Sequence, residues 1–138
     1  YTVFSTMARS VGDEYRRNGD TAAAERYWRI AADSPAGDAE ARAQAANALA
    51  AFYLERDEPD RAYRRACQAV ALAAGPAHRL IRAKTALALV RQGHGPSTGA
   101  LLEQAREDLG AIPPQSPLHP RARELMNDPL LQKPFVAP

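Results

Sequence analysis

The sequence has little of several residue types on which other protein classes depend. Cys67 is the only cysteine, so no disulfide can form within the chain. No apolar run approaches the roughly 20 residues needed to cross a bilayer. The histidines lack the i, i+4 spacing of a helical zinc site, and no cysteine pair exists. We therefore expect no membrane span, no bound metal and no cofactor.

Lysine is also scarce, with Lys84 and Lys133 as the only examples. Arginine supplies the remaining positive charge, and the formal net charge is only +2. So small a charge predicts no strong attraction to nucleic acid or to an anionic membrane. Arginine favours planar, bidentate partners, so some of these side chains can hold carboxylates. The coding bias of a GC-rich genome is the simpler explanation.

One group of arginines, Arg61, Arg64 and Arg65, lies beside Tyr63 on a single predicted helix. Such a group could contact phosphates, but acidic residues surround it in the sequence. They are Glu55, Glu58 and Asp60. We therefore expect nucleic-acid binding to be unlikely for this chain.

The composition favours helices over sheets. Alanine is abundant, whereas aromatic residues make up 7% of the chain and Val and Ile are few. Alanine loses no side-chain entropy on becoming helical, and β-branched residues do. No segment alternates polar and apolar residues with a period of two. The sequence predicts an all-α fold, and its 138 residues suffice for a hydrophobic core.

Glycine and proline divide the chain into predicted helices. Gly19 suits the left-handed residue after a helix end, and Asp20 suits the cap of the next helix. Asp57 is predicted to cap a later helix whose first turn contains Pro59. The proline-rich stretch 112–117 is predicted to be extended. The helices are expected at about 3–17, 21–32, 40–55, 58–74, 78–92, 97–109 and 120–126.

The first four predicted helices contain an internal repeat. Val11 corresponds to Leu49, Tyr15 to Tyr53 and Ala24 to Ala62, always 38 positions apart. A third, looser unit follows, because Gly93 lies 36 residues after Asp57. Helix pairs that recur at such a period are typical of an α-solenoid.

These residues resemble the tetratricopeptide repeat (TPR) family, whose units carry W-x2-L-G-x2-Y, then A-x3-F, then P. The first unit reads Ala8-x2-Val11-Gly12-x2-Tyr15, then Ala24-x3-Trp28, then Pro35. The second is weaker, with Ala46-x2-Leu49-Ala50-x2-Tyr53 and Ala62-x3-Ala66. The resemblance covers about residues 5–109 and fades toward the C-terminus.

The resemblance implies how the helices pack. Small residues such as Gly12, Ala24, Ala50 and Ala62 are expected where the two helices of a hairpin meet. Tyr15, Trp28 and Tyr53 are expected to fill the space between neighbouring hairpins. The family's usual period is 34 residues, and we assign the surplus here to a longer connector at 34–40.

In the resembled family the first helix of each pair lines a concave groove that receives a peptide or a helix. The positions implied here are Arg9, Asp13, Arg16, Asn47, Ala51, Leu54, Leu80, Lys84 and Leu87. Some family members hold a C-terminal carboxylate with Lys, Asn and Arg at set positions. That set is not reproduced, since Asp13, Ala48 and Leu80 stand at three of them. The leucines suit an amphipathic or apolar segment better.

Few residues suggest catalysis. Cys67 lies among apolar helix positions and is expected to be a small buried thiol. His78, His94 and His119 do not form a cluster in the sequence. The glycine-rich stretch 93–99 lacks the Gly-Lys-Ser/Thr ending of a phosphate loop and follows no strand. We do not expect an enzyme.

Two regions are predicted: a TPR-like repeat region at 1–111, and a connector, capping helix and tail at 112–138. The capping role follows from Leu118, Leu125, Leu130 and Leu131, since a terminal repeat needs its apolar face covered. Alternatively, the segment 129–135 folds into the groove of its own chain or of a neighbour. The chain starts at Tyr1 rather than Met, so we expect a processed form or an excised domain.

Together these observations predict an α-solenoid of about three antiparallel hairpins. Its expected function is to bind a peptide, helix or domain of another protein in its groove. The alternative is a structural role in which copies of the chain self-associate into a homo-oligomer.

Overall fold

The computed structural model describes residues 2–93 and 98–132, and every regular element in these ranges is an α-helix. The all-α prediction is confirmed for this part of the chain. Eight helices follow in order: α1 Thr2–Arg17, α2 Thr21–Asp33, α3 Ala39–Glu55, α4 Pro59–Leu72, α5 Pro76–Arg91, α6 Thr98–Gly110, α7 His119–Met126 and α8 Pro129–Gln132.

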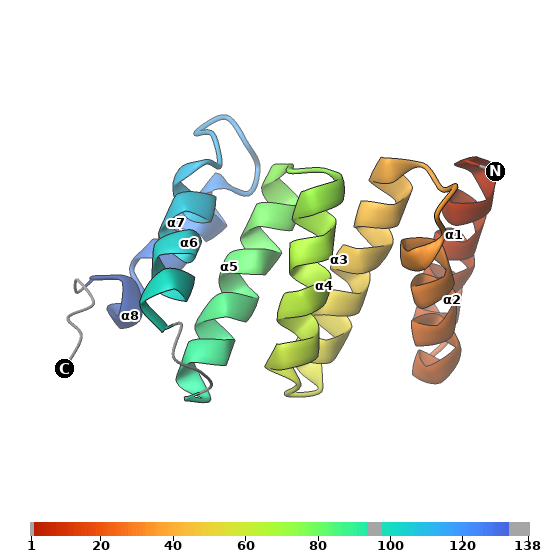
Figure 1. Ribbon diagram of the computed structural model, residues 1–138, viewed down its shortest axis with the longest axis horizontal. Helices are drawn as coiled ribbons and strands as arrows, with labels where there is room; N and C mark the ends of the chain where they lie inside the picture. Colours follow the sequence, from red (N-terminus) through yellow and green to blue (C-terminus); the bar gives the residue numbers. More distant parts are fainter. Residues whose placement is uncertain (1, 94–97, 133–138) are drawn as a thin grey trace.

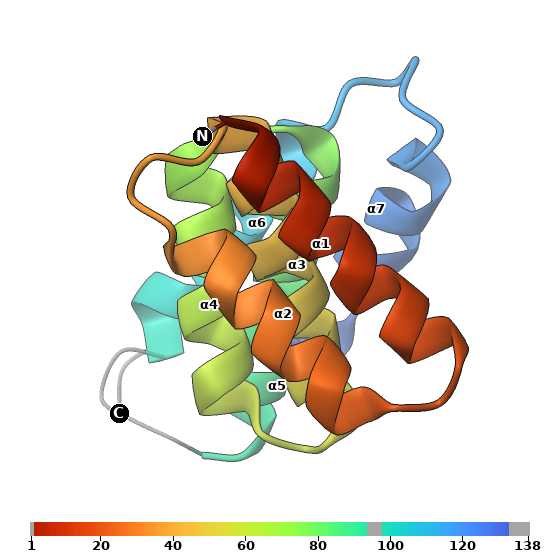
Figure 2. The same ribbon diagram turned by 90° about the vertical axis from the view of Figure 1, so that its right-hand side faces the viewer.

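The first six helices form three consecutive hairpins, α1–α2, α3–α4 and α5–α6, that lie in a row (Figure 1). Each hairpin packs on the next through the contacts of α2 with α3 and of α4 with α5. The first helices also contact each other directly, α1 with α3 and α3 with α5. Figure 2 views the row from its N-terminal end, where α1 and α2 lie in front of the other helices.

Each of the three hairpin turns contains a residue with a positive φ angle. Gly19, Asp57 and Gly93 have φ angles of +83°, +60° and +73°. Glycine adopts this left-handed region without a steric cost, and Asp tolerates it better than most residues. The recurrence of this conformation at intervals of 38 and 36 residues agrees with the repeat in the sequence.

The predicted caps are confirmed at one turn and wrong at another. The Asp20 carboxylate accepts a hydrogen bond from the Ala23 N–H at 3.1 Å, as a helix cap does. Asp57 does not cap α4, because it occupies the left-handed position. Glu58 precedes that helix without a side-chain cap, and Pro59 lies in its first turn as predicted.

The first repeat is longer than the second because of one connector. Between α2 and α3 the chain needs residues 34–38, whereas residues 73–75 suffice between α4 and α5. Asp38 ends the longer connector and caps α3 by accepting from the Ala41 N–H at 3.0 Å. The two extra residues of the first repeat therefore lie in the connector to which the surplus had been assigned.

Inside the first hairpin a small residue packs against a large one. A Cβ atom at Gly12 would lie 2.6 Å from Cδ1 of Trp28, so the indole ring packs directly on the glycine backbone. The corresponding residues are Ala50 with Ala66, and Ala86 with Leu102; each pair belongs to one buried cluster. The equivalent positions of the three hairpins thus hold residue pairs of different sizes.

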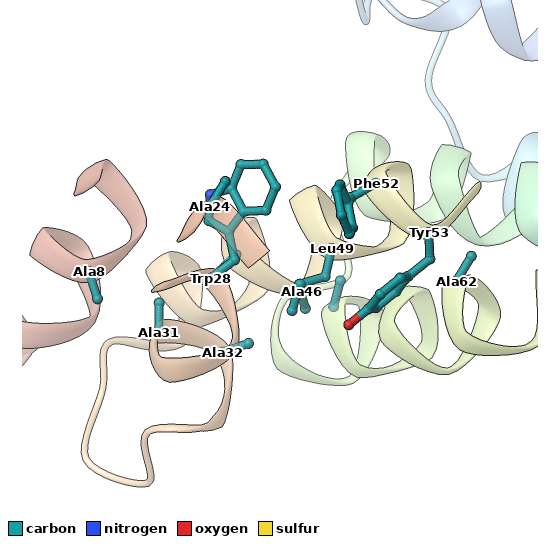
Figure 3. Packing of buried hydrophobic residues seen from close by; sticks show 12 residues of the cluster. Ala8, Ala24, Trp28, Ala31, Ala32, Ala46, Leu49, Phe52, Tyr53 and Ala62 are labelled. Carbon is teal, nitrogen blue, oxygen red and sulfur yellow. The ribbon is translucent and has the colours of Figure 1, made fainter. Parts of the chain in front are cut away.

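Aromatic rings connect the first two hairpins. Trp28 lies edge-on to Phe52 with ring centroids 6.3 Å apart, and Phe52 lies edge-on to Tyr53 at 5.5 Å (Figure 3). Trp28 and Tyr53 are buried as predicted, each 2% exposed. Tyr15 is partly exposed: it stacks on Tyr27 of its own hairpin at 5.4 Å and also packs against the cluster that contains Trp28 and Tyr53.

The C-terminal region differs from the prediction in two respects. The stretch 112–117 is not extended: Ser116 N–H donates to Pro113 C=O and His119 N–H donates to Ser116 C=O, which makes successive turns. The short helix α8 was not expected. Leu131 of α8 and Ala122 of α7 join the buried cluster of α6, so this region packs on the last hairpin.

Some predictions concern residues that the structure does not describe. His94, the proposed helix start at Ser97, and the part of the tail that follows Gln132 lie outside the described ranges. Within those ranges, no helix is both long enough and apolar enough to cross a bilayer.

Candidate functional site

The groove residues predicted on α1 and α3 are largely occupied by bonds to other parts of the chain. The Asp13 carboxylate accepts from the Trp28 indole N–H at 2.9 Å and from Arg9 at 2.9 Å. Arg16 of α1 forms an ion pair with Glu55 of α3 at 3.0 Å. These side chains therefore hold helices together in the free protein.

A similar contact joins α3 to α5. The Asn47 amide nitrogen lies 2.9 Å from Nδ1 of His78 and donates to the Ala77 carbonyl at 3.2 Å. His78 is buried, with Nε2 3.6 Å from the carboxylate of Glu40. Asn47 thus connects successive hairpins through their first helices.

The predicted apolar positions divide into two groups. Leu80 is 8% exposed and Leu87 is 1% exposed, so both belong to the core and do not line an open surface. They lie on the side of α5 that packs inside the molecule. Ala51 and Leu54 are partly exposed on α3, next to the small cluster of Ala50, Ala66 and Ile81.

Lys84 is the free charge in the predicted set. Its side chain is partly exposed on α5 and forms no hydrogen bond or ion pair in the described part of the chain. The structure therefore retains Lys84, Ala51 and Leu54 as accessible groups on the first helices, beside the exposed Arg16–Glu55 pair.

A cleft lies on a different surface of the molecule. It has a volume of about 380 Å³ and lies along the second helices, α2 and α4. We call it the arginine cleft and define it by four arginines and three further polar residues: Arg29, Arg61, Arg64, Arg65, Asp33, Tyr53 and Gln68. A second hollow of about 330 Å³ adjoins it and shares Arg29 and Asp33, with Arg26 and Ile30 as its other walls.

Two of the arginines are held in place by the chain itself. Arg65 donates to both oxygens of Asp33, at 2.6 and 3.2 Å, and to the side-chain oxygen of Gln68 at 2.9 Å. This contact with Arg65 lowers the pKa of the Asp33 carboxyl below its ordinary value of 3.8, although partial burial opposes the shift. Asp33 is therefore ionised at neutral pH and keeps Arg65 in position.

Arg61 is fixed from the other side. Its guanidinium lies over the Tyr53 ring, 4.2 Å from the centroid, and pairs with Glu58 at 3.0 Å and with Glu25 at 3.5 Å. The Tyr53 hydroxyl donates to Glu25 at 2.7 Å, pointing away from Phe52 (Figure 3). Burial, followed by this bond to Glu25, raises the pKa of Tyr53, so the phenol stays protonated.

Sequence reasoning did not find the cleft, although a signal existed. Arg26 and Arg64 are separated by 38 residues, so they occupy equivalent positions on the second helices of the first two hairpins. Of the acids near this group in the sequence, Glu55 pairs with Arg16 outside the cleft, whereas Glu58 pairs with Arg61 of the cleft itself.

The remaining candidates for chemistry stay apart. No group of three or more His, Cys, Asp or Glu side chains within the described ranges is placed to hold a metal ion. Cys67 is partly exposed rather than buried as predicted. Burial, and then a hydrogen bond with Cys67, raises the pKa of Tyr63.

No protein-family model matches this chain, and comparisons with curated proteins and with solved structures also find no match.

Proposed function

We propose that this chain is a TPR-like solenoid that binds a segment of another protein. The observation that carries the proposal is the direct contact of α1 with α3 and of α3 with α5. Helices that adjoin in this way present one continuous surface, which is how stacked helical repeats receive a partner. The repeated left-handed turns and the repeated small-residue contacts support the same assignment.

The C-terminal helices complete this proposal as a cap. Leu131 and Ala122 cover the last hairpin, with Leu118, Leu125 and Leu130 packed around them. Arg106 of α6 also donates to the Leu131 carbonyl at 3.3 Å. A cap of this kind shields the apolar face that the final repeat of a stack would otherwise expose to water.

The surface of the first helices suits an amphipathic segment. Ala51 and Leu54 offer partly exposed apolar area, and Lys84 offers an unpaired positive charge. A guest helix or extended peptide could bury its apolar side on α3 and place an acidic group near Lys84. This proposal does not require the buried Leu80 and Leu87 to take part.

Site-specific photo-cross-linking tests the proposal. A photoreactive residue is placed at Lys84 or Arg16, with exposed Gln115 of the connector as the control position. We expect protein adducts in a lysate of the source organism from the two helix positions only, and we expect excess unlabelled protein to compete them away. Equal labelling from Gln115, or adducts that resist competition, would contradict the proposal.

One observation favours self-association as a second candidate. Phe4, Met7 and Val11 lie on one face of α1 by their spacing of three and four residues, and they are 54%, 61% and 38% exposed. Large apolar side chains grouped in this way often mark an interface. Light scattering over a concentration series should show growth in mass that Met7→Glu abolishes; a persistent monomer would exclude this candidate.

A further inference from the structure

We infer that the arginine cleft binds an acidic segment of a partner protein, in which an apolar side chain adjoins one of two negatively charged groups. The inference rests on the proposed function and adds a second contact surface to it, on the side of the second helices. The cleft is not part of the groove that the TPR resemblance implies.

The charges in the cleft are only partly balanced within the chain. Arg61 is paired with Glu25 and Glu58, and Arg65 is paired with Asp33. Arg29 of α2 and Arg64 of α4 form no hydrogen bond or ion pair with any residue that the structure describes. Asp60, one turn before Arg64, does not pair with it either. After the hydrogen bond from Arg65, the charge of Arg29 also contributes to the lowered pKa of Asp33 without a direct bond to it, so both guanidinium groups keep their hydrogen-bond donors unused in the described part of the chain.

The surplus of charge is local. Five arginines line the cleft and the adjoining hollow, together with one carboxylate, Asp33; Glu25 and Glu58, the partners of Arg61, lie outside both linings. An anionic group is the chemically complementary ligand.

The walls of the cleft are already ordered before a ligand binds. Arg65 is held by Asp33 and Gln68, and Gln68 in turn donates to the Ala32 carbonyl at 3.1 Å. Arg61 is stacked on the buried Tyr53 ring. A ligand therefore has to order only Arg29 and Arg64, which reduces the entropic cost of binding.

The shape of the site selects among anionic ligands. A guanidinium group binds a carboxylate or a phosphate with two parallel hydrogen bonds, so Arg29 and Arg64 suit two such groups. In the neighbouring hollow Ile30 is 40% exposed beside Arg29. An apolar side chain next to the acidic group held by Arg29 would contact this isoleucine, and a peptide can supply both features.

Nucleic acid fits the same surface less well. Glu25, Asp33 and Glu58 adjoin the arginines and would repel a continuous phosphate backbone. A short peptide avoids these carboxylates because its charges occupy only selected positions.

Fluorescence anisotropy with the whole chain tests the inference. The probes are a labelled Glu/Asp peptide that also contains leucines, a phosphoserine version, a neutral Gln/Asn version and a single-stranded oligonucleotide. The cleft variant is Arg29→Ala/Arg64→Ala. The matched control is Arg121→Ala/Arg123→Ala, which removes the same charge from exposed positions on α7.

We expect one or both acidic peptides to bind, the neutral peptide not to bind, and the cleft variant to weaken binding by roughly tenfold or more. The control variant should bind like the wild type, and all proteins should unfold at the same temperature because the substituted arginines are exposed. The preferred acidic probe distinguishes carboxylate from phosphate recognition.

Three results would overturn the inference: no binding of either acidic peptide, equal weakening by the control variant, or tighter, steeply salt-dependent binding of the oligonucleotide. Photo-cross-linking from Lys84 and Arg16 separates this failure from that of the proposed function. If cross-linked adducts still form at Lys84 and Arg16 but neither acidic peptide binds, the cleft assignment is wrong and the proposed protein-binding function is unaffected.

Discussion

Between α1 and α4 the core consists of alanines and aromatic rings, whereas from α5 onward leucines fill it. The first cluster holds eight buried alanines around Trp28, Leu49, Phe52 and Tyr53. The later cluster contains seven buried leucines and only four alanines. The TPR-like signature depends on small residues and aromatic rings, so it fades along the chain although the hairpins continue.

The two regions also differ in the burial of their ion pairs. In the C-terminal half Asp108 is fully buried on α6 and accepts from Arg82 at 2.7 and 2.8 Å and from Arg79 at 3.2 Å. This hydrogen-bonded contact raises the pKa of Arg82. In the N-terminal half the comparable pair, Asp33 with Arg65, lies at the surface. One half therefore relies on a buried ion pair, and the other on close packing.

The largest expected effect tests this contrast at Asp108. Asp108→Ala leaves Arg79 and Arg82 facing a buried site without a counter-charge, which should cost about 3 kcal/mol of unfolding free energy. This loss is at the lower end of the range for removing one partner of a buried ion pair, because both arginines are partly exposed and can turn toward water. Urea denaturation followed by circular dichroism measures it.

The control for that prediction is Asp60→Ala, which removes an exposed acid that forms no ion pair in the structure. We expect a change of less than about 0.5 kcal/mol. Equal losses for the two variants would mean that the ion pairs of Asp108 do not support the C-terminal half.

The close packing of the first hairpin is tested at Gly12. A methyl group there would lie 2.6 Å from the Trp28 ring, so Gly12→Ala should cost about 1–3 kcal/mol. Gly110→Ala is the matched control, because a Cβ at that position meets no atom within 4 Å. The control should be neutral or slightly stabilising. A tolerated Gly12→Ala would show that the ring does not pack as described.

The turns offer a smaller test of the repeat. Asp57 occupies the position at which the other two hairpins have glycine, so Asp57→Gly should stabilise the chain by about 0.5–1 kcal/mol. Gly19→Ala should destabilise it by about 1 kcal/mol for the same reason. Thermal unfolding of both variants would measure these effects. Unfolding temperatures that both rise or both fall relative to the wild type would contradict the equivalence of the turns.

The smallest effect concerns pH. Because Arg65 holds the folded pKa of Asp33 below 3.8, the stabilisation exists above that value and is lost as the pH falls through the folded pKa. The carboxylate side chain is 52% exposed, so the contribution should stay below about 0.5 kcal/mol. Asp33→Asn should lower stability slightly at neutral pH and leave it unchanged in strong acid; a loss that persists in acid would exclude this cause.

Much of the fold could be predicted because its boundaries are local. Gly19 and Asp20 end one helix and begin the next through their own backbone and side-chain preferences, and Pro59 begins α4 in the same way. The turns at 112–117 and the short helix α8 were missed. Their conformation depends on contacts with α6, such as that of Leu131, which no local pattern reveals.

The candidate site was harder to predict than the fold. Whether an arginine is free or paired depends on which side chains face it across neighbouring helices. Arg65 and Arg64 are adjacent in the sequence, yet Arg65 meets Asp33 of α2 and Arg64 meets no partner in the described chain. Likewise the sequence predicts Leu80 and Leu87 on an open surface, but both side chains are buried in the core beneath α5.

The most direct test of the central claim exchanges the packing of one hairpin for that of another. Gly12→Ala/Trp28→Leu copies the Ala86–Leu102 pair of the third hairpin into the first, and a double-mutant cycle measures the coupling between the two changes. If the hairpins are equivalent units, Gly12→Ala should cost clearly less in the Trp28→Leu background, with a favourable coupling of about 1 kcal/mol or more. Additive losses would contradict the claim that these helix pairs are repeats of one packing unit.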